Sequence, residues 1–359
     1  MKLAIEPILV SFLIVARDAA RDLPDLLADV AAQDYPAECV ELILVDGLSG
    51  DGTRRIMENF AADHPHRAIK ILDNHKRTLA PGWNLALSLA AGAVFIRVDA
   101  HCRLPPDFIR KNVELLSSGE NIVGGMTLTN PPARRWPRLI ALADSSRFGG
   151  GAALFRNAGC PGYVETLAYA AFRRQVLANV GGFDERLERN QDNEMHARMR
   201  AAGYKFYYHP EIRSFHKARK SLRGLLRQKF ENGAWIGPTL AVNCASFRLR
   251  HFAPALFLGT LGLGLGLAFT GRWFFLAALA AAYALAAAWY SLEATREAPG
   301  WRIRLLCLLL PLIFLTIHIS YGLGTMASIV KMPRFMREKH RYVPPRPVKK
   351  SNGSDNFPR

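Results

Sequence analysis

The 359-residue sequence has few cysteines, and they form no pattern that would bind zinc or build a disulfide framework. Their number is odd, their positions are scattered, and no two have the short spacing of a metal or redox motif: Cys39, Cys102, Cys160, Cys244 and Cys307. We therefore expect the soluble part in a reducing compartment. We expect the first apolar run to be a strand rather than a secretory leader, because it follows a single lysine and is broken by Glu6 and Pro7.

Two nucleotide and nucleic-acid signatures are missing as well. After the first expected strand the chain has Ala16-Arg17-Asp18 in place of the Gly-x-Gly-x-x-Gly turn, which argues against an NAD-dependent enzyme. The formal net charge of +17 would suggest nucleic acid, but no nucleic-acid motif accompanies it. The basic residues crowd beside apolar segments, as in 331–350, where anionic lipid headgroups explain them better. The sequence thus predicts membrane lipids as partners and no nucleic acid.

Short apolar strands alternate with helical patterns in the first part of the chain. Strands are expected at 8–15, 42–45, 69–72 and 94–98, the last one buried apart from Arg97. Stripes of apolar residues between them, such as Leu23, Leu26, Leu27 and Val30, indicate helices. This alternation predicts an α/β fold with a doubly wound, mostly parallel sheet.

Polar residues gather where these strands end. Asp99 and His101 follow the fourth strand, and an extended turn lets both side chains point to one side and share a divalent cation. An aspartate that merely starts a turn is the alternative for Asp99. Other strand ends carry polar residues too, and this pattern suits the ligand crevice of an open α/β sheet: Arg17 and Asp18, Asp46, Asp73 and Asn74.

Four segments together resemble the family 2 glycosyltransferases, which have the GT-A fold. They are LILVDGLSGDGT (42–53), APGWNLALSLAAGAVFIRVDAH (80–101), GGFDERLERNQDNEMHARMRAAG (181–203) and HKARKSLRGLLRQKFENG (216–233). The likeness extends from about Val10 to Gly237. Within the family, the chain looks most like the membrane-attached glucosyltransferases of succinoglycan-type exopolysaccharide synthesis.

The resemblance implies a pocket for a nucleotide-diphosphate sugar, with UDP-sugar as the expected donor. Asp46 suits the base or ribose, because a carboxylate on a rigid strand accepts hydrogen bonds. Family members often carry a second acidic residue where this chain has Gly47. The remaining donor-binding residues that the resemblance implies are Ala16, Arg17, Asp73, Lys217 and Arg219.

The resemblance also implies a metal ion, Mn²⁺ or Mg²⁺, that neutralises the leaving diphosphate. The family motif is Asp-x-Asp, whereas this chain has Asp99-Ala100-His101, and an imidazole favours Mn²⁺. His216, followed by basic residues, matches a histidine that reaches the metal in similar enzymes. The predicted ligands are Asp99, His101 and His216.

Asp192 matches the position of the family's catalytic base. From the residues alone, the simpler interpretation is a helix N-cap, since a helical pattern follows. The helix dipole there favours the ionised carboxylate. Glu194 is the reserve candidate. One base and a metal-bound leaving group imply a single displacement with inversion, without a carboxylate nucleophile.

Processive members of the family carry Gln-x-x-Arg-Trp, which this chain matches poorly around Gln228 and Trp235. We therefore expect the addition of one sugar, and an amphipathic, interfacial helix in this region that presents Arg223, Arg227 and Lys229 to lipid or diphosphate.

Membrane-spanning segments are expected after the catalytic part. The runs 252–270 and 273–292 are near the roughly 20 residues that cross a bilayer. A third candidate, 305–330, contains Pro311 and His318. Three spans would place the basic tail from Lys331 outside, against the positive-inside tendency. The third segment is then re-entrant or interfacial, or the tail is an exception.

The sequence thus predicts a cytoplasmic catalytic domain (1–237), a membrane domain (238–330) and a basic, flexible tail (331–359). Its expected function is inverting, metal-dependent transfer of one sugar to a lipid-linked oligosaccharide in exopolysaccharide synthesis. The expected location is a bacterial-type inner membrane, with several passes. The alternative is a nucleotide-binding membrane scaffold or transporter component without transfer activity.

Overall fold

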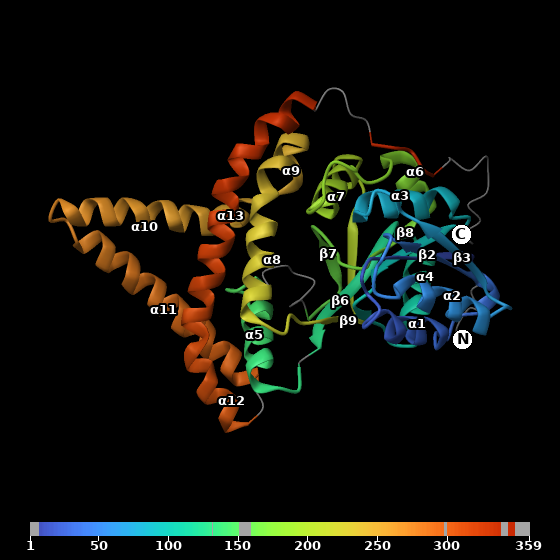
Figure 1. The fold of residues 1–359 in the computed structure, drawn as a ribbon, viewed down its shortest axis with the longest axis horizontal. Coiled ribbons are helices and arrows are strands. Elements are labelled where there is room, and N and C mark those ends of the chain that lie inside the picture. The colour runs from blue at the N-terminus through green and yellow to red at the C-terminus, as the bar shows by residue number, and fades with distance from the viewer. Residues whose placement is uncertain (1–6, 131, 151–158, 298–299, 339–343, 349–359) are drawn as a thin grey trace. The chain divides into compact units, whose positions relative to one another are not determined.

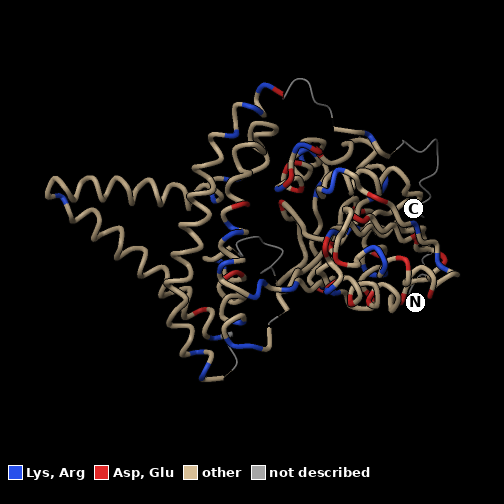
Figure 2. Tube along the Cα trace, in the orientation of Figure 1, with Lys and Arg blue, Asp and Glu red and all other residues tan. Residues whose placement is uncertain are grey.

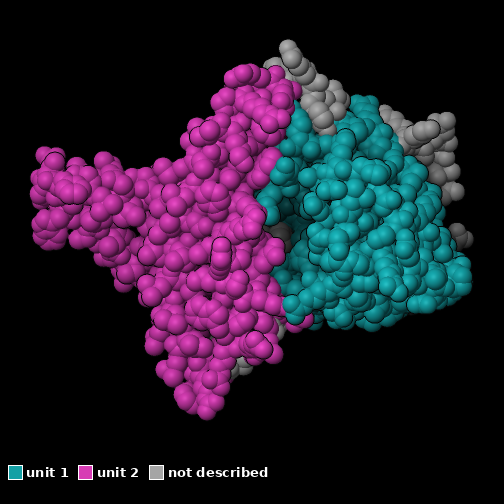
Figure 3. All heavy atoms as spheres, in the orientation of Figure 1, with its two compact units in different colours: residues 1–128, 157–217, 342–359 teal, residues 129–156, 218–341 magenta. Residues whose placement is uncertain are grey.

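The computed structural model describes residues 7–130, 132–150, 159–297, 300–338 and 344–348. The chain forms two compact units, coloured teal and magenta in Figure 3. Unit 1 comprises Met1–Leu128, Asn157–Lys217 and Tyr342–Arg359, and unit 2 comprises Thr129–Arg156 and Ala218–Arg341. The division after Lys217 differs from the boundary at 237 expected from sequence, because the intervening helix packs with the apolar C-terminal helices.

The first half of unit 1 is a parallel sheet with the strand order β3-β2-β1-β4 (Figure 1). Every strand predicted from sequence is confirmed to within two residues: β1 Val10–Ala16, β2 Val40–Asp46, β3 Ala68–Asp73 and β4 Val94–Asp99. The connecting helices are α1 Leu23–Ala31, α2 Thr53–Asp63 and α3 Leu79–Leu89, with the short turn η1 Ala37–Cys39 before β2. All residues of β1 and β2 are buried, as helices covering both faces of a parallel sheet require.

The second half of unit 1 continues the sheet with antiparallel strands in the order β4-β8-β6-β9-β5, and β7 pairs with β9. The whole sheet is therefore mixed, with the parallel half as predicted. These strands are β5 Cys102–Arg103, β6 Ile122–Asn130, β7 Gly162–Val164, β8 Ala171–Arg173 and β9 Phe206–Lys217. The helices are α4 Phe108–Ser117, α6 Arg174–Val180 and α7 Gln191–Ala201.

Unit 2 is helical. It consists of α5 Arg135–Ser145, α8 Leu222–Ala234, α9 Ile236–Val242, α10 Ala253–Phe269, α11 Phe274–Glu297, α12 Trp301–Leu306 and α13 Leu310–Glu338, with short turns η3 Cys244–Ser246, η4 Leu249–Phe252 and η5 Cys307–Leu309. Three helices of the described residues are long and apolar enough to cross a membrane, by length and composition. Figure 2 shows that α10 and α11 carry almost no charged residues along their length.

The first two predicted spans form a helical hairpin, closed by Gly271 with φ of +80°. The third differs from the prediction. After the η5 turn the helix restarts at Leu310, and Pro311 lies in its first turn, where a missing N–H costs nothing. The helix then continues to Glu338, so residues 331–338 are helical instead of forming the start of a flexible tail.

Candidate active site

The carboxyl ends of the parallel strands meet at one edge of the sheet. Asp46 pairs in register with Ala16 on one side and with Asp73 on the other. Asp99 pairs with Val15 from the opposite side of β1. The polar strand ends predicted from sequence therefore form one row across β3, β2, β1 and β4.

Asp46 is buried and held in a fixed orientation. Its two carboxylate oxygens accept hydrogen bonds from the Ser49 amide (3.1 Å) and hydroxyl (2.5 Å). The neighbouring Gly47 leaves room for Arg17, because a Cβ on Gly47 would lie 2.9 Å from Arg17 Cβ. This contact explains why a second acidic residue is absent here: its side chain would displace Arg17.

The loops after β1 and β2 are tied together by side chains. The Asp18 amide donates to Ser49 Oγ at 2.9 Å, and the Ala20 amide donates to Asp51 Oδ2 at 3.0 Å. A hydrogen bond from Thr53 is the main reason that the pKa of Asp51 lies below its usual value. These bonds fix the backbone on both sides of Arg17 and Asp46.

Three of the predicted donor-binding residues have other partners. Asp73 forms an ion pair with Arg54. Lys217 Nζ lies 2.9 Å from Asp22 Oδ1 and 2.8 Å from Asp25 Oδ2. Arg219 belongs to unit 2, where its Nε donates to the side-chain oxygen of Gln228 at 3.0 Å. The row of strand ends thus contains Ala16, Arg17, Asp46 and Asp73, but not Lys217 or Arg219.

Asp192 lies at the start of α7, and Arg97 of β4 holds it. Arg97 Nη2 is 2.7 Å from Asp192 Oδ1, and the two side chains are 11% and 41% exposed. Asn190, with φ of 59°, is the N-cap, so Asp192 is inside the first turn and is not the cap. The carboxylate is therefore fixed by a cation and by the helix N-terminus while much of its surface stays open.

Arg97 is a nearly buried cation surrounded by aromatic rings and carboxylates. Its guanidinium lies over the rings of Trp83 and Phe183, 5.3 and 5.2 Å from their centroids. Burial alone would lower the pKa of Arg97, but the carboxylates of Asp192 and Asp99 outweigh it and raise the pKa. Arg97 thus links the metal-site candidate to the base candidate. The sequence analysis missed this role, although a lone arginine in an apolar strand was its signal.

Glu194, the reserve candidate for the base, is buried in a bidentate ion pair. Its two oxygens lie 2.7 Å from Nε and Nη2 of Arg198. Arg198 also donates to the carbonyls of Val180 and Gly182. This geometry ties α7 to the end of α6 and gives Glu194 a structural role.

His196 is a second residue that sequence reasoning missed. It is buried on α7, its Nδ1 lies 2.7 Å from Thr166 Oγ1, and its ring packs edge-to-face on Phe206. Burial is the largest cause that lowers its pKa, to about 3. His196 is therefore neutral at physiological pH, one turn beyond Asp192.

His101 and His216 lie together, as the predicted metal site requires. Their ring centroids are 5.2 Å apart, edge-to-face, and the Lys217 amide donates to the His101 carbonyl at 3.3 Å. Cys102 pairs with His216, which brings β5 and β9 together just after Asp99. Across the described part of the chain, no three His, Cys, Asp or Glu side chains form a ready-made metal cluster. The two imidazoles are adjacent, and a cation held by them would take further ligands from elsewhere, such as a bound diphosphate.

Residues 11–181, just under half of the chain, match the family model described as glycosyl transferase family 2. The family resemblance stated from the four sequence motifs is confirmed.

Among curated relatives, the succinoglycan biosynthesis protein ExoA of Rhizobium meliloti is 29% identical over 217 residues, 59% of this chain and 64% of the relative. The chain thus matches less than two thirds of that relative's length. A dolichyl N-acetyl-α-D-glucosaminyl phosphate 3-β-D-2,3-diacetamido-2,3-dideoxy-β-D-glucuronosyltransferase of Methanococcus voltae is 26% identical, over 63% of this chain and 71% of the relative.

Among solved structures, the mannosyltransferase PcManGT from Pyrobaculum calidifontis, in complex with GDP-Man and Mn²⁺, has a TM-score of 0.55. It is 20% identical, and 89% of each chain is covered. The fold of unit 1 is of the GT-A type, as expected from the motifs.

Proposed function

We propose that the protein is an inverting glycosyltransferase that moves one sugar from a nucleotide-diphosphate sugar to a lipid-linked glycan in exopolysaccharide synthesis. The observation that carries this proposal is Asp192, a half-exposed carboxylate at a helix N-terminus. It is fixed by Arg97, which lies within the residues 11–181 that match the family 2 model. The relatives support the acceptor class, because the names of several refer to polysaccharide synthesis or to lipid phosphates.

The donor nucleotide, a UDP-sugar in this proposal, binds along the row of strand ends. Asp46, already oriented by Ser49, presents carboxylate oxygen to the base or ribose. Arg17 lies beside it, and Ala16 and Asp73 border the same row. Lys217 is bound by two carboxylates, and Arg219 belongs to unit 2, so both stay predicted donor contacts outside the row of strand ends.

Asp99, His101 and His216 would hold Mn²⁺ or Mg²⁺ together with the diphosphate oxygens. When bound, the cation neutralises charge on the departing diphosphate. The pair of imidazoles favours Mn²⁺ over Mg²⁺.

Asp192 acts as the general base. It takes the proton from the acceptor hydroxyl, whose oxygen attacks the anomeric carbon from the side opposite the diphosphate. The bond to the diphosphate oxygen breaks, the electron pair leaves with the nucleoside diphosphate, and the configuration inverts. Arg97 keeps the carboxylate oriented for this step. Since nucleotide sugars are made in the cytoplasm, we place the catalytic unit on the cytoplasmic face of a bacterial-type inner membrane.

The test is transfer by the Asp192→Asn variant, with radiolabelled nucleotide sugars and lipid-linked acceptors in membranes. We expect a loss of about 10²–10⁴-fold in transfer while donor binding survives, since only proton removal is lost. The matched control is Glu188→Gln, an exposed carboxylate on the preceding loop, which keeps wild-type activity. Near-normal turnover of Asp192→Asn would refute the assignment. Donor binding without product from any acceptor would favour the scaffold alternative.

A further inference from the structure

Within the residues that the structure describes, three helices are long and apolar enough to cross a membrane, yet α13 differs from the other two in its neighbours. One third of its most apolar window is buried, against 6% for α10 and 11% for α11. Its first half packs on α5 through an apolar cluster that includes Leu139, Ile140, Leu310 and Phe314. Its second half packs on α8 and α9. The helix therefore has protein along one side over its whole length (Figure 1).

The contact between α13 and α8 is close enough to involve backbone. Ser320 Oγ of α13 donates to the Leu226 carbonyl of α8 at 2.7 Å. In the adjoining helix α9, the Gly237 amide donates to Ser328 Oγ of α13 at 3.0 Å. A Cβ on Gly324 would lie 2.1 Å from the Phe230 carbonyl oxygen. These contacts fix α13 and α8 as one layer, so both must lie at the same depth in or on a membrane.

The helix α8 is too charged to lie in hydrocarbon. Arg223 and Arg227 are exposed, and Lys229 forms an ion pair with Asp144 of α5 at 2.6 Å. A single charged residue at the centre of a bilayer costs about 2.5–3.5 kcal/mol by insertion scales. A spanning α13 would take these charges inside with it. The layer of α5, α8 and α13 fits the membrane surface, where charged side chains reach water.

The chain also returns to unit 1 after α13. The Gly182 amide donates to the Pro345 carbonyl at 2.7 Å, and Val348 is buried. Residues 342–359 are grouped with unit 1, which the chain left after Lys217. A chain that leaves a unit and returns to it crosses a membrane an even number of times. Three crossings are excluded by this contact, and two are allowed.

The hairpin of α10 and α11 accounts for those two crossings. Most of its apolar side chains are exposed, and Figure 2 shows no charge along it except at the tip, which carries Arg272, and near the end of α11. Trp273 at the tip and Trp289 near the base are both exposed and 16 residues apart in sequence, which is about 24 Å of helix. Exposed tryptophans at such a separation suit the two interfaces of a bilayer.

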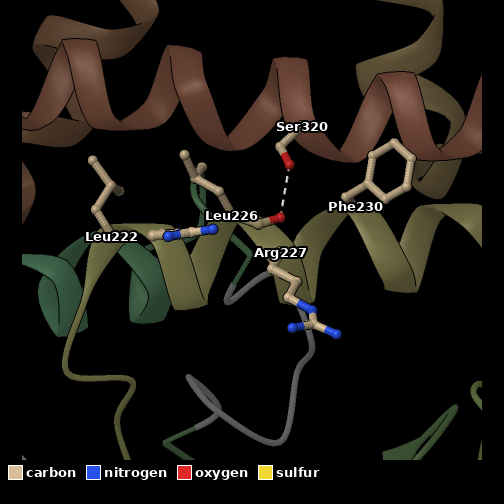
Figure 4. Close-up of a pocket in the computed structure, with 6 residues that line it drawn as sticks. Leu222, Leu226, Arg227, Phe230 and Ser320 are labelled. Atoms are coloured by element: carbon tan, nitrogen blue, oxygen red, sulfur yellow. Dashed lines mark hydrogen bonds between the residues drawn. The ribbon is translucent and has the colours of Figure 1, made fainter.

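The opposite side of α13 is an exposed apolar stripe that includes Leu312, Leu323, Met326 and Val330. Beside it, between α8 and α13, lies a groove of about 520 Å³. Leucine and phenylalanine side chains line this groove, with Arg223 and Arg227 among them, as Figure 4 shows for Arg227. A phospholipid surface would suit both kinds of side chain. Its acyl chains would contact the apolar residues, and its phosphates would pair with the guanidiniums.

We propose that α13 lies along the membrane surface with its apolar stripe against the acyl chains, and that only the α10–α11 hairpin crosses the bilayer. The partner of the stripe and the groove is the phospholipid surface itself. The basic end of α13 and the tail then lie on the same side as unit 1. This removes the conflict with the positive-inside tendency that three spans would create.

The first test locates three epitope tags in the full chain: one before Met1, one between Gly271 and Arg272, and one after Arg359. Protease is added to inside-out and to right-side-out vesicles. We expect the first and last tags to be cut in the same vesicles and the hairpin tag to be cut in the others. A last tag protected where the first is cut means that α13 crosses, and overturns the proposal. The readout is independent of any transfer activity.

The second test measures depth along α13 with nitroxide labels on Leu312→Cys, Leu323→Cys and Val330→Cys, in a chain whose native cysteines are replaced by alanine. Residues 312 and 330 are about 27 Å apart along the helix. The depth of each label is obtained from the enhancement of its relaxation by oxygen and by a nickel complex. A helix on the membrane surface gives three similar, shallow depths. A spanning helix gives a deep centre between two shallow ends, which would overturn the proposal. The control Ala281→Cys, midway between the two tryptophans of α11, should report a deep position, and circular dichroism shows that each variant is folded.

Discussion

Arg97 Nη2 lies 2.7 Å from Asp192 Oδ1, which joins a central strand of the sheet to the first turn of α7. The pair is asymmetric, because the arginine is nearly buried between two aromatic rings while the aspartate remains open on one side. A rigid cation therefore positions a carboxylate that stays accessible. This relationship separates Asp192 from the nearby Glu194, whose two oxygens are both bound by Arg198.

Replacing Arg97 tests whether it positions the base. We expect Arg97→Met to lower kcat by about 10–100-fold with little change in donor KM, because the carboxylate loses its fixed geometry while the donor row is intact. Arg97→Lys keeps the charge but loses the planar fork, so it should recover only part of kcat. Steady-state kinetics with a lipid-linked acceptor give both parameters.

The control for this pair of variants is Arg198→Lys, which disturbs the structural ion pair to Glu194 on the same helix. That variant should lose stability before it loses kcat per folded molecule. Equal loss of kcat and of donor binding in Arg97→Met would instead mean that Arg97 only supports the fold.

Gly47 gives a prediction about the donor row. A Cβ at this position meets Arg17 Cβ at 2.9 Å, so Gly47→Ala must push the Arg17 stem or the loop aside. We expect a loss of about 1–3 kcal/mol in stability and weaker binding of nucleoside diphosphate. Gly50→Ala is the matched control, since a Cβ there meets nothing within 4 Å. Calorimetry measures the affinity of both variants for UDP. Equal affinities would show that Arg17 is not part of the pocket.

His101 gives a prediction about metal choice. His101→Asp restores the family's Asp-x-Asp pattern and replaces a borderline nitrogen ligand by a hard oxygen ligand. Binding of nucleoside diphosphate should then shift in its dependence from Mn²⁺ towards Mg²⁺, whereas His101→Ala should weaken it with either ion. Titrations of UDP with each metal measure the ratio. An unchanged ratio in His101→Asp would remove His101 from the ligand set.

The parallel half of the fold was predictable because its signals are local. Buried strands such as β1 and β2 are runs of apolar, β-branched residues, and each ends at a polar residue. The antiparallel half was not predictable, since β7 and β8 have three residues each and show no period. Their positions depend on pairing with β9 and β4, which are distant in sequence.

The candidate site shows the same division. The strand ends Asp46, Asp73 and Asp99 follow from the alternation of strands and helices, and Asp192 from the family motif. The partner Arg97 lies 95 residues before Asp192 in the sequence, so no local pattern indicates their contact. The helix α13 shows a further limit: hydropathy records how apolar a segment is, but not that one side of it is covered by α5 and α8.

His196 gives a prediction about stability and pH. Its pKa is about 3 in the folded chain, below the ordinary value of 6.5, mainly because it is buried. Asp192 opposes the shift, and Arg97 and Arg200 add to it. Below pH 6.5 the unfolded chain binds a proton that the folded chain does not, so stability falls as the pH falls. A difference of one bound proton lowers the free energy of unfolding by about 1.4 kcal/mol per pH unit below the pKa of the unfolded chain. Between pH 7.5 and pH 5 the loss is about 2 kcal/mol.

His196→Gln removes the group that binds this proton. The glutamine amide can replace the imidazole as the hydrogen-bond partner of Thr166. Chemical denaturation of the full chain in detergent, followed by tryptophan fluorescence at several pH values, measures the difference. We expect the variant to be less stable than the wild type at pH 7.5, because packing against Phe206 is lost, but to lose less stability on acidification. His209→Gln, a second histidine of unit 1 on β9, is the control and should keep the wild-type slope. If the free energy of unfolding depends on pH equally in His196→Gln and in the wild type, the folded chain binds this proton as readily as the unfolded chain. That outcome would contradict a buried, neutral His196.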